Sequence, residues 1–281
     1  MLFDRRRGPL AGPGTKGAFA FGLRLVAGDG TGLDAADTPE NAAEFGVTQG
    51  GNPQVRLLAL IECGTHALID AAFDGVTKAS EHKLARRLLH ALNAGMLLLA
   101  DRNFAGHELW GMVTATGSDM LWRIKKNLVF PAVEILPDGS FLSSIMPTPA
   151  ENRRRGIARA HGRSLGRTPH GHLVRIIEYI EYIEYTVTIK TADGRTRTEP
   201  FRLVTTLPDH EQAPAAEIAA VYHERWEIEN GYGELKTRLR GGGVHPALQA
   251  SGTRLPGTVR AARRLPSAVH AEVRSGPGRR H

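Results

Sequence analysis

Hydrophobic positions in the first half of the chain follow two periods. Leucines at helical spacing predict a helix over 81–94, which Ser80 caps and Gly95 ends, and a shorter helix is expected over 107–116. Consecutive strands followed by alternating strands and helices predict an α/β fold, with a mixed central sheet flanked by helices. The strands are predicted from apolar runs at residues 23–26, 55–63, 66–73, 96–100 and 120–126.

The segment 128–208 has a different pattern. Short alternating runs are broken there by Pro-Asp-Gly, Pro-Thr-Pro and Ala-Asp-Gly, which are typical of turns. We therefore expect a β-rich insertion, with an exposed arginine-rich loop at 153–167. Within the insertion, Ile-Glu-Tyr occurs three times in succession over 177–185, which indicates replication slippage inside a strand. A helical pattern returns over 215–239 and ends before three glycines.

The composition is that of an ordinary soluble globular protein of 281 residues, of which 41% are hydrophobic and 23% charged. No apolar run approaches the ~18 residues of a membrane span, and the opening MLFDRRR does not begin a signal peptide. We therefore expect a soluble, cytoplasmic protein without membrane contact. Cys63 has no partner for an intrachain disulfide, and the twelve histidines have no zinc-binding spacing. Disulfide scaffolds and zinc fingers are excluded.

The net charge of +7 is unevenly distributed. Residues 237–281 contain nine Arg and a single acid, a net charge of +8, so residues 1–236 sum to −1. Charge alone is therefore weak support for DNA binding by the globular part. After Leu239 the sequence has no aromatic residue, Ile or Met and no regular hydrophobic period. This composition predicts a basic disordered tail over 241–281.

The helical segment 215–239 carries candidate chemistry. On a helical wheel, Tyr222, Arg225, Glu229 and Lys236 share a stripe about 60° wide. A carboxylate can bind Mg²⁺, two cations can bind phosphate oxygens, and a phenol can donate a hydrogen bond or stack on a base. The alternative is an ordinary solvated face in which Arg225 and Glu229 form an i,i+4 pair. Trp226 is expected in the core rather than against a base.

Two further acids lie near predicted strand ends. Asp101 follows the buried run at 96–100, and Asp29 lies just past the run at 23–26, where a central sheet presents ligands in a crevice. Each has an alternative role, because Asp29 in Gly-Asp-Gly can form a turn and Asp101 can cap the following helix. Together with Glu229, the two aspartates favour a metal site.

These residues resemble a known family. The stretch from Tyr222 to Glu229, followed by Lys236, resembles the Y-(2)-R-(3)-E-(6)-K signature of bacterial insertion-sequence DDE transposases. Asp29 in Asp-Gly-Thr, followed by Asp-Thr-Pro-Glu-Asn, and Asp101 in Asp-Arg-Asn-Phe resemble the first and second aspartate motifs of that family. The resemblance covers roughly residues 20–240.

The resemblance implies a ribonuclease H-like catalytic core interrupted by the β-rich insertion. It further implies an enzyme that cleaves the DNA ends of an insertion sequence and joins them to target DNA. Such an enzyme is expected to be associated with the bacterial nucleoid, and the resemblance is compatible with a homodimer. The expected divisions are a remnant or linker at 1–19, core at 20–127, insertion at 128–208, core completed at 209–240, and tail at 241–281. The implied site comprises Asp29, Asp101 and Glu229 as catalytic ligands of two Mg²⁺ or Mn²⁺ ions, and Tyr222, Arg225, Lys236, Arg102 and Asn103 as contacts to double-stranded DNA.

The chain departs from the family pattern at both ends. Only 28 residues precede Asp29, where the family usually has a helical domain, and the Arg-rich tail replaces apolar helices after Lys236. We therefore expect a truncated copy with a frame-shifted C-terminus. A catalytically inactive DNA-binding or dominant-negative fragment is the alternative, and an unrelated two-metal nuclease is a third. The segment 28–32 lacks the Lys-Ser/Thr of a phosphate loop, so no nucleotide cofactor is expected.

Overall fold

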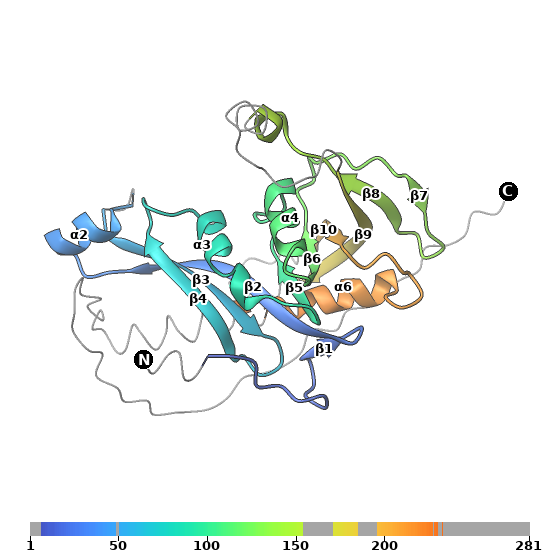
Figure 1. The fold of residues 1–281 in the computed structure, drawn as a ribbon, viewed down its shortest axis with the longest axis horizontal. Coiled ribbons are helices and arrows are strands. Elements are labelled where there is room, and N and C mark those ends of the chain that lie inside the picture. The colour runs from blue at the N-terminus through green and yellow to red at the C-terminus, as the bar shows by residue number, and fades with distance from the viewer. Residues whose placement is uncertain are drawn as a thin grey trace.

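A single mixed β-sheet organises the chain in the computed structural model (Figure 1). The structure describes residues 7–48, 51–153, 171–184, 196–226, 228–229 and 232, with backbone alone for 179–184 and 196–200. The strands lie in the order β4-β3-β2-β5-β6-β10-β9-β8-β7, and β1 pairs with β2 outside this path. The strands are β1 (Phe19–Ala20), β2 (Leu23–Asp34), β3 (Gln54–Glu62), β4 (Leu68–Gly75), β5 (Met96–Ala100), β6 (Asp119–Arg123), β7 (Glu134–Ile135), β8 (Phe141–Ile145), β9 (His172–Glu184) and β10 (Thr196–Thr205).

Parallel pairing is confined to the centre of the sheet. β5 runs parallel to both β2 and β6, whereas the other pairs in the sheet are antiparallel. The continuous apolar run of β5 fits this position, because a strand buried on both faces needs no polar side. The predicted mixed sheet is confirmed, although strands outnumber helices among the described residues. This arrangement is consistent with a ribonuclease H-like fold.

The described helices are short. The predicted helix over 81–94 ends at Arg87 and continues only as a 3₁₀ turn, whereas its N-cap is confirmed because Ser80 Oγ accepts a hydrogen bond from the backbone N–H of Lys83 (3.4 Å). None of the helices in the described part of the chain has the length and apolar character needed to cross a membrane. The helices are α2 (Pro39–Phe45), α3 (Glu81–Arg87), η1 (Leu89–Ala91), α4 (His107–Thr114) and α6 (Ala215–His223).

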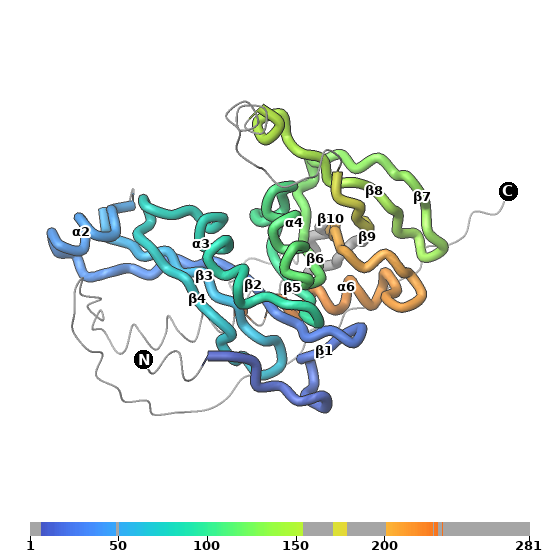
Figure 2. The backbone as a smooth tube through the Cα atoms, in the orientation of Figure 1, coloured from blue at the N-terminus to red at the C-terminus, as the bar shows by residue number. Residues whose placement is uncertain are grey.

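Helices cover both faces of the sheet. Leu84 of α3 and Trp110 of α4 are buried in one apolar cluster, where Trp110 meets Trp122 of β6 edge to face at 5.1 Å. On the opposite face, Ile218 of α6 packs in a second cluster with residues of β2, β3, β5 and β6. The central strands are therefore buried between α3 and α4 on one side and α6 on the other. Figure 2 shows the path of the backbone through these elements.

The strands of segment 128–208 belong to the same sheet as the first half of the chain. β10 pairs antiparallel with β6, with Val204 opposite Trp122, and β9 and β8 follow outward. β9 contains the Ile-Glu-Tyr repeat as far as Glu184 and pairs with β10 without a register shift over that length. The domain boundaries stay a prediction. Residues 154–167 of the expected arginine-rich loop and the tail at 241–281 lie outside the described residues.

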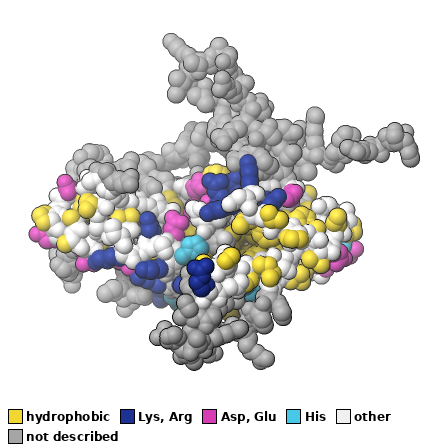
Figure 3. All heavy atoms as spheres, turned by 90° about the horizontal axis from the view of Figure 1, so that it is seen from above, with side chains coloured by type: hydrophobic (Ala, Val, Ile, Leu, Met, Phe, Trp, Pro, Cys, Tyr) yellow, Lys and Arg dark blue, Asp and Glu magenta, His cyan; other side chains and the backbone are white. Residues whose placement is uncertain are grey.

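The far end of this sheet contributes little to the core. Val129, Val133 and Ile135, which lie before and within β7, are each more than 70% exposed. Hydrophobic side chains gather on this side of the molecule when it is seen from above (Figure 3). The burial that stabilises the fold is thus concentrated around β2, β3, β5, β6 and β10.

Gly75, at the end of β4, lies close to the backbone of Phe45 in α2. A Cβ at this position would lie 2.8 Å from the carbonyl carbon of Phe45 and closer still to its oxygen. Because backbone cannot move aside as a side-chain tip can, we expect Gly75→Ala to lower the free energy of unfolding by about 1–3 kcal/mol. Urea unfolding measures this change. Gly14→Ala is the control, since a Cβ there meets nothing within 4 Å, and an equal loss in both variants would contradict the prediction.

Candidate active site

Parallel pairing of two strands brings Asp29 and Asp101 to neighbouring positions in the sheet. Gly28 of β2 is paired with Ala100 of β5. Asp29 follows Gly28 in the chain, and Asp101 follows Ala100. Strand register therefore accounts for the meeting of two acids that are far apart in the sequence. The expectation that Asp29 lies just past a strand is wrong, because β2 continues to Asp34 with Asp29 inside it, which also excludes a turn-forming role.

Burial dominates the electrostatics of Asp29. It raises the pKa of the carboxyl from 3.8 to about 6, and the charges of Glu229 and Asp101 add to the rise. The backbone N–H of Gly30, which donates to Asp29 Oδ1 at 2.8 Å, and the charge of Arg225 lower the pKa. The ionised form of Asp29 is therefore incompletely stabilised by its surroundings, and an additional cation would favour it.

Asp101 does not cap the helix that follows it. The N-cap residue of α4 is Gly106, five positions later, and the backbone N–H of Glu108 in the first turn donates to Glu151 Oε1 at 3.2 Å. The backbone carbonyl of Asp101 instead accepts a hydrogen bond from the N–H of Phe104 at 3.1 Å, which closes a turn. The alternative role of Asp101 as a helix cap is therefore excluded.

Tyr222 joins α6 to the end of β5. Its side chain is 1% exposed, and its hydroxyl donates a hydrogen bond to the carbonyl oxygen of Ala100 at 3.3 Å, next to Asp101. Burial raises the pKa of this phenol far above its ordinary value, so the hydroxyl stays neutral. In this arrangement Tyr222 holds α6 against the sheet, and its predicted contact with a DNA phosphate stays a prediction.

Arg225 connects two of the three acids. Its Nη1 lies 3.4 Å from Asp29 Oδ2, and its Nη2 lies 3.0 Å from Glu229 Oε1. The Arg225 side chain is 6% exposed, whereas that of Glu229 is 42% exposed. Arg225 Nε is buried without a hydrogen-bond partner among the described residues. The i,i+4 pair of Arg225 and Glu229 is therefore present, but it faces the acid cluster rather than open solvent.

The helix that carries these residues is not continuous. α6 ends at His223, and helical geometry resumes at Trp226 after a turn. Within this turn the N–H groups of Glu224 and Arg225 bond to carbonyls three residues earlier, which tightens the backbone. The predicted uninterrupted helix over 215–239 is therefore wrong at this point, although Tyr222, Arg225 and Glu229 still share one side of the segment.

Of Trp226 and Tyr232, only Tyr232 is buried. Trp226 is 44% exposed, with its ring 5.2 Å from the Arg225 guanidinium carbon, so its expected core position is wrong. Tyr232 is 6% exposed instead, and its hydroxyl donates to the Asp29 carbonyl oxygen at 2.5 Å and accepts from the Ala59 N–H at 3.0 Å. The helical wheel could have found Tyr232, because it lies about 20° from Arg225 there.

The remaining predicted DNA contacts are more peripheral. Arg102 and Asn103 are both exposed in the turn after β5, and the Asn103 carbonyl accepts a hydrogen bond from His82 Nε2 at 2.7 Å. Their exposure next to Asp101 leaves them accessible to a ligand. Lys236 lies outside the described residues.

The acids offer oxygen donors of the kind that Mg²⁺ and Mn²⁺ prefer. Asp29 and Glu229 both contact Arg225, and Asp101 is close enough for its charge to raise the pKa of Asp29. Within the described ranges, no group of three or more His, Cys, Asp or Glu side chains is arranged to hold a metal ion. The donor chemistry thus fits a divalent cation, whereas the Arg225 contacts would have to be replaced for all three acids to bind one.

Comparison with known proteins identifies the family to which the chain belongs. Residues 20–245 match the family model described as "Transposase DDE domain". The chain is also 30% identical over 226 residues to "Transposase InsG for insertion sequence element IS4" of Escherichia coli (strain K12). That alignment covers 78% of this chain and 45% of the relative, so the chain spans about half of the relative's length. Because the family model covers most of the chain and includes Asp29, Asp101 and Glu229, the chain belongs to the DDE transposase family.

Proposed function

We propose that this chain provides metal-dependent cleavage and strand transfer of DNA during transposition of an insertion sequence. The observation that carries the proposal is the parallel pairing of β2 and β5, which brings Asp29 and Asp101 to neighbouring positions, where Arg225 contacts both Asp29 and Glu229. Family membership supports this function over that of an unrelated nuclease with a similar metal site. The proposed fold is ribonuclease H-like.

Asp29, Asp101 and Glu229 are the proposed ligands of Mg²⁺ or Mn²⁺. When bound, such ions would activate the attacking water or 3′-hydroxyl and stabilise the leaving oxygen at phosphorus. The buried position of Asp29 supports this assignment, because its carboxylate lacks full compensation from the protein. Tyr232, which bonds to the backbone carbonyl of Asp29, would fix the carboxylate's position in the strand.

Arg225 is the proposed residue that recognises the transferred phosphate. Its guanidinium lies near two aromatic rings, with its central carbon 5.8 Å from the centroid of the Tyr222 ring and 5.2 Å from that of the Trp226 ring. Its unpartnered Nε–H could be satisfied by a phosphate oxygen once the ion pairs with the acids open. Lys236, Arg102 and Asn103 are proposed to contact the DNA backbone nearby, on double-stranded element ends and target DNA.

A second candidate function is that of a catalytically inactive DNA-binding or dominant-negative transposase fragment. The observation that favours it is the pairing of Arg225 with both Asp29 and Glu229, which neutralises charge that a metal ion would otherwise neutralise. The two functions differ in one measurable property, because the inactive fragment needs no divalent cation.

Calorimetric titration with Mn²⁺ distinguishes them. We expect the wild-type protein to bind Mn²⁺ and Glu229→Gln to bind it at least about tenfold more weakly, because a carboxylate ligand is lost. Glu217→Gln is the matched control, since Glu217 is an exposed acid in the first turn of α6. A folded wild type that does not bind Mn²⁺ would contradict the proposed enzyme and favour the inactive fragment.

A further inference from the structure

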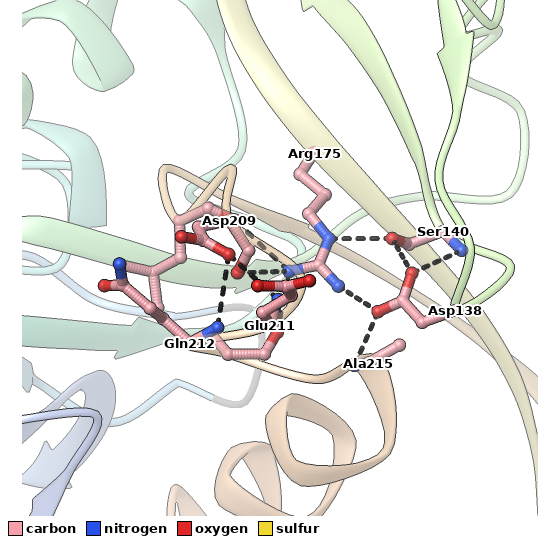
Figure 4. A network of polar contacts seen from close by, with 9 residues as sticks. Asp138, Ser140, Arg175, Asp209, Glu211, Gln212 and Ala215 are labelled. Atoms are coloured by element: carbon pink, nitrogen blue, oxygen red, sulfur yellow. Dashed lines mark hydrogen bonds and ion pairs between the residues drawn. The ribbon is translucent and has the colours of Figure 1, made fainter.

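A buried arginine joins three segments of the chain at the start of α6 (Figure 4). Arg175 of β9 is fully buried, and its Nη2 forms an ion pair with Asp138 in the turn between β7 and β8. Its Nε donates to Ser140 Oγ at 2.7 Å, and its Nη1 donates to the carbonyl oxygen of Ala213 at 2.7 Å. Arg175 thus connects the insertion to the chain segment that leads into α6.

Asp138 completes the first turn of α6 from outside the helix. The residue at the N-cap position, Pro214, provides no side-chain cap, but Asp138 Oδ2 accepts a hydrogen bond from the backbone N–H of Ala215 at 2.9 Å. A carboxylate at this end of a helix satisfies an otherwise unpaired N–H and interacts favourably with the helix dipole. Asp138, from a turn 77 residues earlier in the chain, therefore serves as the cap that the local sequence lacks.

The surroundings keep Asp138 ionised. Burial by itself would raise the pKa of its carboxyl, but hydrogen bonds from Ser140 and Ala215 together with the charge of Arg175 hold the pKa below its ordinary value. Ser140 donates to Asp138 Oδ1 through both its hydroxyl (2.6 Å) and its backbone N–H (3.1 Å). The carboxylate is thereby fixed in place and in charge at the helix terminus.

The other end of α6 carries the residues of the candidate active site. Tyr222 lies seven residues after Ala215, about 10 Å along a helix, and bonds to Ala100 beside Asp101. Arg225 lies in the turn that follows α6, and Glu229 lies in the helical segment after it. The position of α6 along its axis is thus set by the Arg175–Asp138 ion pair at one end and by Tyr222 at the other.

We propose that Arg175 and Asp138 are positioning residues, which hold the start of α6 so that Arg225 and Glu229 lie opposite Asp29 and Asp101. This inference rests on the proposed function of those four residues. It gives the insertion a role in assembling the active site, because both positioning residues come from its strands and turns. If the ion pair had a purely structural role, its loss would instead destabilise α6 and the strands of the sheet equally.

Hydrogen–deuterium exchange of the full chain tests the local effect. We expect the amides of α6 to exchange about tenfold faster in Asp138→Ala, which loses the cap and the charge, and two- to fivefold faster in Asp138→Asn, which loses only the charge. The amides of β2 and β5 should exchange as in the wild type. If the alanine variant does not fold, the asparagine variant alone carries the test.

The matched control is Glu178→Gln. Glu178 forms an ion pair of 2.6 Å with Arg202 between β9 and β10, but it is half exposed and has no contact with α6 among the described interactions. This control should leave α6 exchange unchanged. Unchanged α6 exchange in both Asp138 variants, or equal acceleration in α6, β2 and β5, would overturn the positioning role.

Mn²⁺ affinity links the network to the site. We expect the dissociation constant for Mn²⁺ to rise at least threefold in Asp138→Ala, less in Asp138→Asn, and not at all in Glu178→Gln. A wild type that binds Mn²⁺ no more tightly than Asp138→Ala would overturn only the positioning role. A folded wild type without Mn²⁺ binding would overturn the proposed function and the positioning role with it.

Discussion

Asp29→Asn is expected to stabilise the metal-free protein at pH 7.5 while abolishing Mn²⁺-dependent nicking of supercoiled plasmid DNA. The gain in stability follows from removing a carboxylate that is mostly buried and close to Glu229 and Asp101. The loss of nicking, on the order of a thousandfold, follows from removing a proposed ligand that acts as part of one catalytic unit. Opposite effects on stability and activity are characteristic of a site built for a cation.

The gain in stability should depend on pH in a defined direction. The pKa of Asp29 is about 6 in the folded protein, whereas the ordinary value of 3.8 applies in the unfolded chain. Asp29 therefore keeps its proton to a higher pH in the folded protein than in the unfolded chain. The contribution of Asp29 to the free energy of unfolding therefore falls as pH rises from about 4 to about 6, by about 1–3 kcal/mol. Asp29→Asn lacks this decrease, so its advantage is absent at pH 4 and complete above pH 7.

Thermal unfolding between pH 4 and pH 8, without divalent ions, measures this difference. Asp34→Asn is the control, because Asp34 is an exposed residue of the same strand. That substitution should change the free energy of unfolding by no more than about 0.5 kcal/mol. A lower melting temperature for Asp29→Asn than for the wild type at pH 7.5 would show that Asp29 is stabilised by its surroundings, contrary to the prediction.

Arg225→Gln is expected to lower the free energy of unfolding by about 3 kcal/mol in the absence of metal. Removing this side chain, which is 6% exposed, leaves Asp29 and Glu229 without the cation that both contact. Urea unfolding at pH 7.5 measures the loss. The control is Arg86→Gln, which breaks an exposed pair with Glu108 (3.1 Å) and should change stability by less than about 1 kcal/mol.

Two additions identify the cause of the Arg225 effect. The double variant Asp29→Asn with Arg225→Gln should be more stable than Arg225→Gln alone, because one uncompensated charge is gone. Mn²⁺ at a hundred times its dissociation constant should restore about 2.7 kcal/mol to Arg225→Gln by binding the folded state. If neither change restores stability, the loss arises from packing against Tyr222 and Trp226 rather than from charge.

Local sequence determined the elements whose signals are contained within a few residues. The run at 96–100 is strand β5 because five consecutive apolar residues suit a strand that is buried on both faces. Ser80 begins α3 because its hydroxyl accepts a backbone hydrogen bond three residues ahead. Tyr222, Arg225 and Glu229 meet because helical spacing fixes their angles, even though a turn interrupts the helix.

Only the tertiary structure decided which of these elements meet. The length of β2, and therefore the position of Asp29 inside it, depends on pairing with β3, whose residues lie about thirty positions away. Trp226 is exposed, whereas Ile228 and Tyr232 of the same segment are buried in the core. Asp138 caps Ala215 from 77 residues earlier in the chain, so a local pattern in the sequence does not reveal this contact. Sequence spacing fixes angles within an element, whereas register and burial are set by partners that fold against it.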